Sequence, residues 1–350
     1  MRKNMAVEEK QRNNLFDLLK MISIAAVVTV HALVPHKEAA TLISPLLAAI
    51  AVPIFILISA YLRTKKMNKI GVRGAYQPRY MFISFMSLML AYIFIVAIEI
   101  IGCLPLHMKG LPLPFDVHFL DSVPDFLYWF FTGTLGFGSY YIPIMVELIV
   151  FLPLLYMLFK KNRNAGLLLC FGLNLAYDLL SHFLGMSSNA YRLLIFRFTF
   201  MLGCGIYLGT QEERGKKEDV QAGLFLFLGL FYVIVNAYIY EFPIFDTWST
   251  ASMFVAFFAY GFVYFMMKRF SGIGYHKIFV FGKASYHIFL VQMLFYFFYG
   301  NEILIMITRA LPAMVAILLQ VVLAIIITFV IGLLFYHLET RLRKALKIAH

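Results

Sequence analysis

The feature that most constrains this chain is a series of apolar runs long enough to cross a lipid bilayer. About 20 apolar residues form a helix that spans the hydrocarbon layer. The chain has 350 residues, of which 62% are hydrophobic and 14% charged, whereas a soluble domain carries about 25% charged residues. The sequence therefore predicts an all-α fold, a polytopic integral membrane bundle of about ten transmembrane helices. The spans are expected at residues 15–34, 41–62, 79–103, 140–159, 165–186, 191–210, 221–241, 248–267, 278–299 and 313–338.

Positive charges gather at alternate connections between these runs. The net charge is +12, and clusters of Lys and Arg follow the second, fourth, sixth and eighth runs, as with Lys160 and Lys161. The opposite connections carry acidic residues such as Asp121 and Asp125. This distribution follows the positive-inside rule and places both termini in the cytoplasm. We therefore attribute the basic balance to topology and expect no nucleic-acid partner.

The chain is expected to form one integral domain. A cytoplasmic basic leader is predicted at residues 1–14, a single transmembrane domain at 15–338 and a cytoplasmic basic tail at 339–350. The longest outer connection, about 104–139, predicts an aromatic helix at the membrane interface followed by a flexible link. The cysteines show neither disulfide nor metal spacing, so no metal site is expected. They are Cys103, Cys170 and Cys204.

The first run carries three ionisable side chains: Asp17, Lys20 and His31. Each costs roughly 2.5 kcal/mol or more if it faces lipid, so all three should face protein or water. Lys20 and His31 are about three helical turns apart, so they share one stripe of the helix at a separation of roughly 16 Å along its axis. With a cytoplasmic amino terminus, Lys20 lies toward the cytoplasm and His31 toward the outer side.

The arrangement of the first two runs resembles a known family. Asp17, Lys20, ten residues and His31 are followed by Val52–Tyr61, with the sequence VPIFILISAY. The pattern is similar to membrane acyltransferase family three, in which an Arg, ten residues and a His precede a PxFFxxSGY-like second helix. Lys20 stands where the family usually has Arg, and Ala60 where it usually has Gly. Lysine keeps the charge but lacks the planar fork with which Arg grips a carboxylate or phosphate.

The resemblance implies an O-acyltransferase of the bacterial inner, or cytoplasmic, membrane. Acyl-CoA, with acetyl-CoA as the first expectation, would be the co-substrate, and a hydroxyl of an extracytoplasmic or lipid-linked glycan would be the acceptor. Membrane lipids are the other expected partners. His31 would be the general base that takes the proton from the sugar hydroxyl. The alternative is a structural histidine.

The resemblance also points to residues at the catalytic and donor sites. Asp17 is the second catalytic candidate, and Lys20, Arg79 and Ser59 are expected to bind the donor. Ser59 belongs to the second-helix motif, and Arg79 lies in Tyr76–Tyr80, YQPRY, which resembles a basic motif of the family. Simpler alternatives exist, because Asp17 and Lys20 can form an ion pair on consecutive turns. A juxtamembrane arginine can also serve topology or lipid headgroups.

Four acceptor-binding candidates lie in the fourth and ninth runs. Tyr141 and Glu147 belong to a segment that resembles the family's WFLP helix. Ser285 and Gln292 belong to one that resembles its SYxIYLxH signature, with Gln292 where His is usual. The glutamine side chain neither takes up nor releases a proton at neutral pH, so it can form hydrogen bonds at that position but cannot act as an acid or a base.

Two more acceptor-binding candidates, Arg192 and Arg197, precede a family-like Gly-Cys-Gly segment. Glu147 is either protonated or paired with a cation such as Arg197, and either a catalytic or a structural role fits it. The fifth run adds one polar stripe, which either orients an imidazole or ties helices together. Its members are Asn174, Asp178 and His182, and Glu99 is left unassigned.

Two other function classes are open to such a chain. A polysaccharide exporter or flippase would also need many spans and charged residues at depth. A sensor or interaction protein has no positive support in the sequence. The enzyme hypothesis predicts that loss of His31 leaves the glycan exported but unacylated, whereas the exporter hypothesis predicts that the glycan stays inside.

Overall fold

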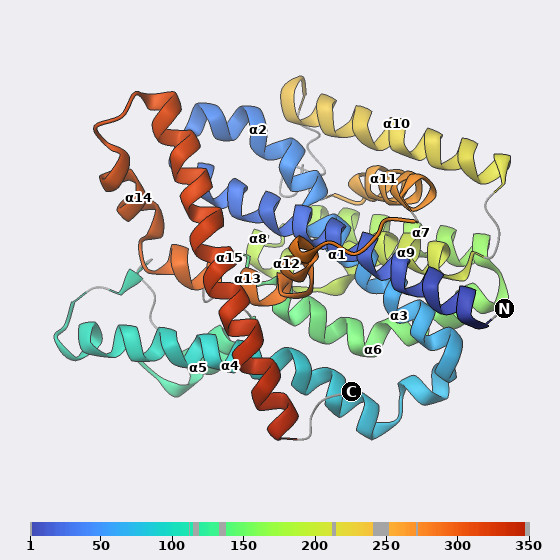
Figure 1. The fold of residues 1–350 in the computed structure, drawn as a ribbon, viewed down its shortest axis with the longest axis horizontal. Coiled ribbons are helices and arrows are strands. Elements are labelled where there is room, and N and C mark those ends of the chain that lie inside the picture. The colour runs from blue at the N-terminus through green and yellow to red at the C-terminus, as the bar shows by residue number, and fades with distance from the viewer. Residues whose placement is uncertain are drawn as a thin grey trace.

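The computed structural model describes residues 2–111, 113–114, 119–132, 138–211, 215–240, 252–270 and 272–346. Within these ranges every regular element is a helix and no strand occurs, so the all-α class is confirmed (Figure 1). The elements are α1 (Arg2–Leu33), α2 (Lys37–Ile50), α3 (Val52–Ala75), α4 (Pro78–Met108), α5 (Val123–Thr132), α6 (Tyr141–Lys161), α7 (Arg163–Phe183), α8 (Ser188–Leu193), the 3-10 helix η2 (Ile195–Phe198), α9 (Thr199–Thr210), α10 (Lys216–Tyr238), α11 (Val255–Arg269), the 3-10 helix η4 (Lys277–Phe279), α12 (Val280–Lys283), α13 (Ser285–Phe297), α14 (Gly300–Thr308) and α15 (Ala313–Ala345).

Among the described residues, 7 helices are long and apolar enough to cross a membrane. An eighth span results if η4 and α12 are counted together with α13, which they meet at a bend of 67°. The other two predicted runs give shorter helices, the apolar segment Ile195–Thr210 and the 15-residue α11. Residues 241–251, where the eighth run is expected to begin, lie outside the described residues. The count is lower than the ten expected spans because two of the predicted runs form short helices and a third is bent.

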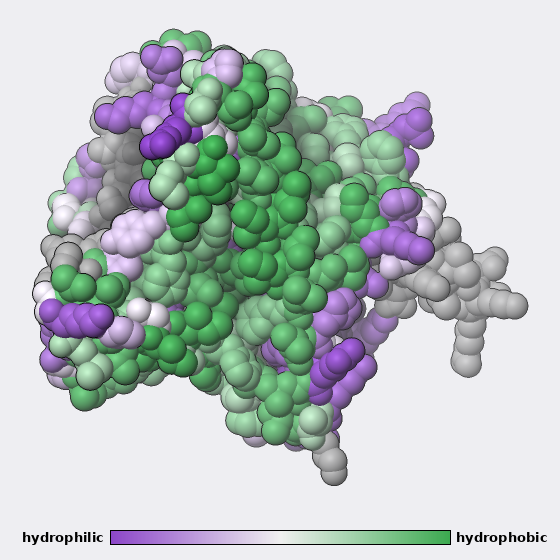
Figure 2. Space-filling view, turned by 60° about the vertical axis from the view of Figure 1, so that its left-hand side comes forward, coloured by the Kyte–Doolittle hydropathy of each residue, from purple (hydrophilic) through white to green (hydrophobic). Residues whose placement is uncertain are grey.

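In the view of Figure 2 a broad hydrophobic surface runs through the middle of the molecule, and hydrophilic residues gather toward the left and right sides. Large apolar side chains project outward along the whole of α15, including Met314 at 79% and Leu318 at 68% exposure. A monomeric soluble protein rarely exposes a contiguous apolar surface of this kind. Together with the length of the helices, this surface identifies a multi-pass membrane protein.

The aromatic segment of the long outer connection forms α5, which has no buried residue. Tyr128 and Phe131 are exposed on it, while the ring of Phe130 lies 5.2 Å from that of Tyr92 on α4. The structure thus has the helix expected there. The expected flexible link falls at residues 133–137, outside the described residues.

Two glycines allow helices to approach α1 and α3 closely. A Cβ atom at Gly282 on α12 would clash with the carbonyl of Asp17 on α1. One at Gly205 on α9 would clash with the carbonyl of Leu57 on α3. Only glycine leaves room for such backbone contacts. Because of the first contact, the residue after Gly282, Lys283, lies beside the middle of α1.

Candidate active site

The stripe predicted on the first helix is present on α1. The Nζ atom of Lys20 lies 2.9 Å from the Oδ1 atom of Asp17, which is 6% exposed. Val27 follows two helical turns after Lys20, and His31 one turn after Val27. The ion pair that the sequence left as an alternative is therefore formed.

Two cavities meet at Lys20. The wider one, of about 500 Å³, is lined by α1, α3 and the segment before α13, with Asn14, Asp17 and Tyr275 among its residues. The narrower one, of about 240 Å³, lies deeper and is mainly apolar. Lys20 and Lys283 line both cavities. Charged and polar side chains make up a larger share of the lining of the wider cavity than of the narrower one. The narrower cavity, called here the inner cavity, is lined by Lys20, Val27, Val52, Phe55, Ser59, Leu88, Tyr141, Met145, Lys283, Ser285, Tyr286 and Phe289.

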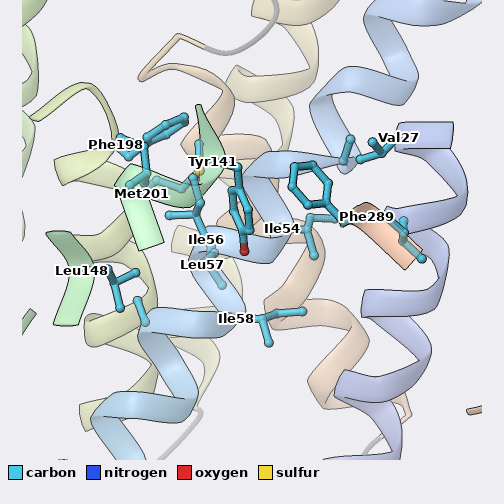
Figure 3. Close-up of a cluster of buried hydrophobic side chains, with 14 of the residues drawn as sticks. Val27, Ile54, Ile56, Leu57, Ile58, Tyr141, Leu148, Phe198, Met201 and Phe289 are labelled. Carbon is cyan, nitrogen blue, oxygen red and sulfur yellow. The ribbon is translucent and has the colours of Figure 1, made fainter. Parts of the chain in front are cut away.

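A few hydroxyl groups lie on the mainly apolar wall of the inner cavity. Tyr141 shares a hydrogen bond with Ser59, and its ring lies 5.2 Å from that of Phe289. Figure 3 places Tyr141 beside the core residues of α3, with Phe289 and Val27 on its other side. Ser285, which is 6% exposed, begins α13 at the same cavity. An apolar pocket with a few convergent polar groups is the usual form of a small-molecule site.

His31 lies one turn beyond the inner cavity and is not among its lining residues. Its ring stacks on Tyr296 of α13 at a centroid distance of 5.7 Å. Its backbone carbonyl accepts a hydrogen bond of 3.1 Å from the side chain of Asn301. The hydroxyl of Tyr296 donates to the carbonyl of Val28 at 2.8 Å. These contacts fix α13 and α14 against the carboxyl-terminal part of α1.

One face of α13 connects the inner cavity with His31. Ser285, Phe289, Gln292 and Tyr296 follow each other at spacings of four, three and four residues, so they share a stripe. The first two line the cavity, and the last stacks on His31. Gln292, which is fully buried, lies between them. The site candidates of the first and ninth runs therefore belong to one continuous region.

Arg79 does not join this region. It is exposed at the start of α4 and lines neither cavity. Two other cations, neither of them a site candidate in the sequence analysis, lie in or beside this region instead. Lys283 lines both cavities, with its Nζ atom 5.4 Å from the ring centroid of Tyr275. Arg63, one turn after Ser59, interacts electrostatically with Tyr141. Arg63 follows Ser59 by four residues and Lys283 precedes Ser285 by two, and this closeness to the family-like motifs could have identified both cations.

The remaining acceptor candidates form a second group beside the amino end of α6. Glu147 accepts a hydrogen bond of 2.6 Å from the backbone amide of Ile195. Arg197 is 1% exposed, and its guanidinium lies 5.2 Å from the ring centroid of Tyr140 and 4.2 Å from that of Phe198. Arg192 lies 5.8 Å from the same Tyr140 ring. Tyr140 precedes Tyr141, so this group adjoins the inner cavity without lining it.

The polar stripe of the fifth run ties helices together. Asn174 donates a hydrogen bond of 3.2 Å to Asp178 and accepts one of 3.2 Å from the backbone amide of Phe200. Tyr191 also donates to Asp178. His182 is exposed. Of the two alternatives for this stripe, the contacts between helices are the ones formed.

The fold defines an integral membrane protein, and two cavities beside α1 share the side chains of Lys20 and Lys283. The family model of the acyltransferase-3 group, described as an acyltransferase domain, matches residues 13–337. The chain belongs to this family and is a membrane acyltransferase. No curated protein and no solved structure matches it. Among the described residues, no group of three or more His, Cys, Asp or Glu side chains is placed to hold a metal ion.

Proposed function

We propose that this acyltransferase moves an acyl group, acetyl in the first instance, from acyl-CoA to a hydroxyl of an extracytoplasmic or lipid-linked glycan. Its location would be the bacterial cytoplasmic membrane, with both termini inside. The observation that carries the proposal is the pair of cavities that share Lys20 and Lys283. A thioester donor needs this combination of a cationic chamber for its phosphates and an apolar one for its acyl end.

Lys20 and Lys283 are the residues that would hold the donor's phosphates. An ammonium group binds phosphate as a compact point charge. Asp17 is too far from His31 to act on it, since 14 residues of helix span roughly 21 Å. Asp17 therefore serves as a positioning residue that holds Lys20 at the cavity. Ser59, Tyr141 and Ser285 are the polar groups available to the thioester carbonyl in the inner cavity. Arg79 is left without a role in this proposal.

His31 would act as the general base. Its imidazole takes the proton from the acceptor hydroxyl while the hydroxyl oxygen forms a bond to the thioester carbonyl carbon. The carbon–sulfur bond then breaks, and the thiolate leaves and takes up the proton from the imidazolium. Hydrogen-bond donors aimed at the carbonyl oxygen stabilise the negative charge that develops there. Gln292, one turn before Tyr296, is the donor candidate nearest to His31 along α13, and Tyr141 supplies a hydroxyl in the inner cavity.

The acceptor would reach this centre from the outer side, past the group around Tyr140. Arg192 and Arg197 can donate hydrogen bonds to sugar oxygens, and the ring of Tyr140 provides a flat apolar surface. Glu147, already held by the amide of Ile195, supports this segment.

Mass spectrometry of surface glycans tests the proposal. Cells with the wild-type protein should carry acylated glycan, and cells with His31→Ala should export the same glycan without the acyl group. His182→Ala is the matched control, because this exposed histidine on α7 lies away from both cavities. Normal acylation in His31→Ala would exclude the assigned base. Retention of the glycan inside the cell would favour the exporter alternative.

A further inference from the structure

A third cavity, of about 910 Å³, lies where α6 and α9 end and α7 begins, against α3. We call it the basic cavity. None of its described lining residues is acidic, and no carboxylate partner is present in the described chain for Lys160, Lys161 or Arg163. Its cations are Lys65, Lys160, Lys161 and Arg163. A concave surface of one charge sign concentrates oppositely charged ligands.

The basic cavity has a fixed wall. The hydroxyl of Tyr156 donates to the Oδ1 atom of Asn68 at 2.6 Å, and the Nδ2 atom of Asn68 donates to the carbonyl of Gly209 at 3.3 Å. Arg163 donates to the carbonyl of Tyr207 at 3.3 Å, with its guanidinium 4.5 Å from the ring centroid of that tyrosine. These bonds join α3, α6, α7 and α9. The cations are therefore presented on a preorganised surface.

Gln211 gives the basic cavity an unsatisfied polar group. It lines the cavity and is 7% exposed, and neither its side-chain oxygen nor its nitrogen has a hydrogen-bond partner in the described structure. Buried amide groups are almost always hydrogen-bonded. A ligand oxygen in the cavity would satisfy the amide N–H. Gln211 thus points to an occupant with hydrogen-bond acceptors, and the surrounding cations point to an anion.

The basic cavity is separate from the two cavities beside α1. On α3, Phe55 and Ser59 line the inner cavity, whereas Lys65 and Asn68 line the basic cavity. At about 100° per residue, Asn68 projects roughly 140° around the helix from Phe55. The body of α3 therefore lies between the proposed donor site and the basic cavity.

We propose that the basic cavity is a second anion site, which binds the phosphate group of a ligand other than the acyl donor. A phosphate carries the acceptor oxygens that the amide nitrogen of Gln211 needs and the charge that the lysines and Arg163 neutralise. A free diphosphate and the headgroup of an anionic phospholipid share this chemistry. The volume of about 910 Å³ is ample for either.

Binding of pyrophosphate to the purified full-length protein in phosphatidylcholine nanodiscs tests the site by calorimetry. Relative to wild type, Lys160→Ala/Lys161→Ala should weaken binding by about tenfold or more, since two charge-assisted contacts are lost. Gln211→Leu, of similar size but without the amide, should weaken it by about fivefold. Lys20→Met should bind pyrophosphate with wild-type affinity, which would show that the measured binding does not take place in the proposed donor cavity. A headgroup source is tested in nanodiscs that contain phosphatidylglycerol, where anionic lipid should raise the melting temperature of wild type but not of the double variant.

Arg341→Gln is the control for charge removal, because this exposed arginine on α15 does not line the basic cavity. It should leave pyrophosphate affinity unchanged. Glu212 and Glu213 follow Gln211 in the sequence but lie outside the described residues, and Glu212→Gln/Glu213→Gln should bind no more weakly than wild type. Equal affinity of wild type, Gln211→Leu and the double lysine variant for pyrophosphate, together with an equal response to anionic lipid, would overturn the proposal. Neither arm depends on acyl transfer, so the outcome is independent of the proposed function.

Discussion

Lys20 is one of the two cations of the proposed donor site, and the carboxylate of Asp17 holds its ammonium group at 2.9 Å. Replacement by Met should raise the KM for acyl-CoA by about tenfold to a hundredfold, because a hydrogen bond to a charged group contributes about 1.5–3 kcal/mol. Lys20→Arg should keep the KM within about threefold, since the charge remains. Steady-state kinetics in nanodiscs measure both values. An unchanged KM in Lys20→Met would remove this residue from donor binding.

Tyr141 offers a second single-atom test. Tyr141→Phe keeps the ring contact with Phe289 but removes the hydroxyl that bonds Ser59. If that hydroxyl stabilises the developing oxyanion, kcat should fall by about a hundredfold while the KM for acyl-CoA changes little. Tyr128→Phe on the exposed face of α5 is the control. A rise in KM with an unaltered kcat would instead mean that Tyr141 only helps to bind the donor.

At the residue scale, the sequence motifs identified polar residues of the inner cavity more successfully than its cations. Ser59, Tyr141 and Ser285 come from three separate runs, and all three line the inner cavity. Cations were harder to assign. Arg79 and Lys283 both lie near the ends of runs, where topology alone requires positive charge. Only the close approach of Gly282 to α1 brings Lys283 to the cavity, and a one-dimensional pattern does not contain that contact.

The contact between α12 and α1 can be tested through Gly282. In Gly282→Ala the new Cβ atom would clash with the carbonyl of Asp17, so α12 must shift. Overpacking of this kind costs about 1–3 kcal/mol. We expect a lower melting temperature and weaker acyl-CoA binding, because Lys283 moves with α12. Gly274→Ala, which meets open space, should change neither. Wild-type stability and donor affinity in Gly282→Ala would show that the two helices can separate without consequence.

Apolar periodicity located the helices but not their breaks. The second run continues through Ala51, where α2 ends and α3 begins, and the ninth bends by 67° beside Ala284. Pro53 stands in the first turn of α3 and is typical of a helix start, so the first break has a local signal that the apolar run obscured. No proline marks the break beside Ala284, and there the close contact of Gly282 with Asp17 lies between segments far apart in sequence. Such contacts are invisible to a reading of local composition.

At the scale of the whole molecule, the orientation in the membrane follows from its charged ends. We expect Asp121→Cys to react with a membrane-impermeant maleimide in intact cells, and Lys161→Cys to react only after permeabilisation. The three native cysteines are buried and free, so they should contribute little background. Mass spectrometry of the labelled protein measures the result. Labelling of Lys161→Cys in intact cells would invert the topology and with it the side from which the donor enters.

The break between α12 and α13 has a consequence for transport across the bilayer. With Lys283 at this corner and Lys20 beside it, the anionic head of a donor need not remain at the membrane surface. The rise along α1 from Lys20 to His31 is roughly 16 Å, about half of the hydrocarbon thickness of about 30 Å. In the proposed mechanism the bent segment therefore shortens the distance across the hydrocarbon layer, and a flexible donor arm of moderate length would carry the acyl group to the opposite compartment while the phosphates stay in the cytoplasm.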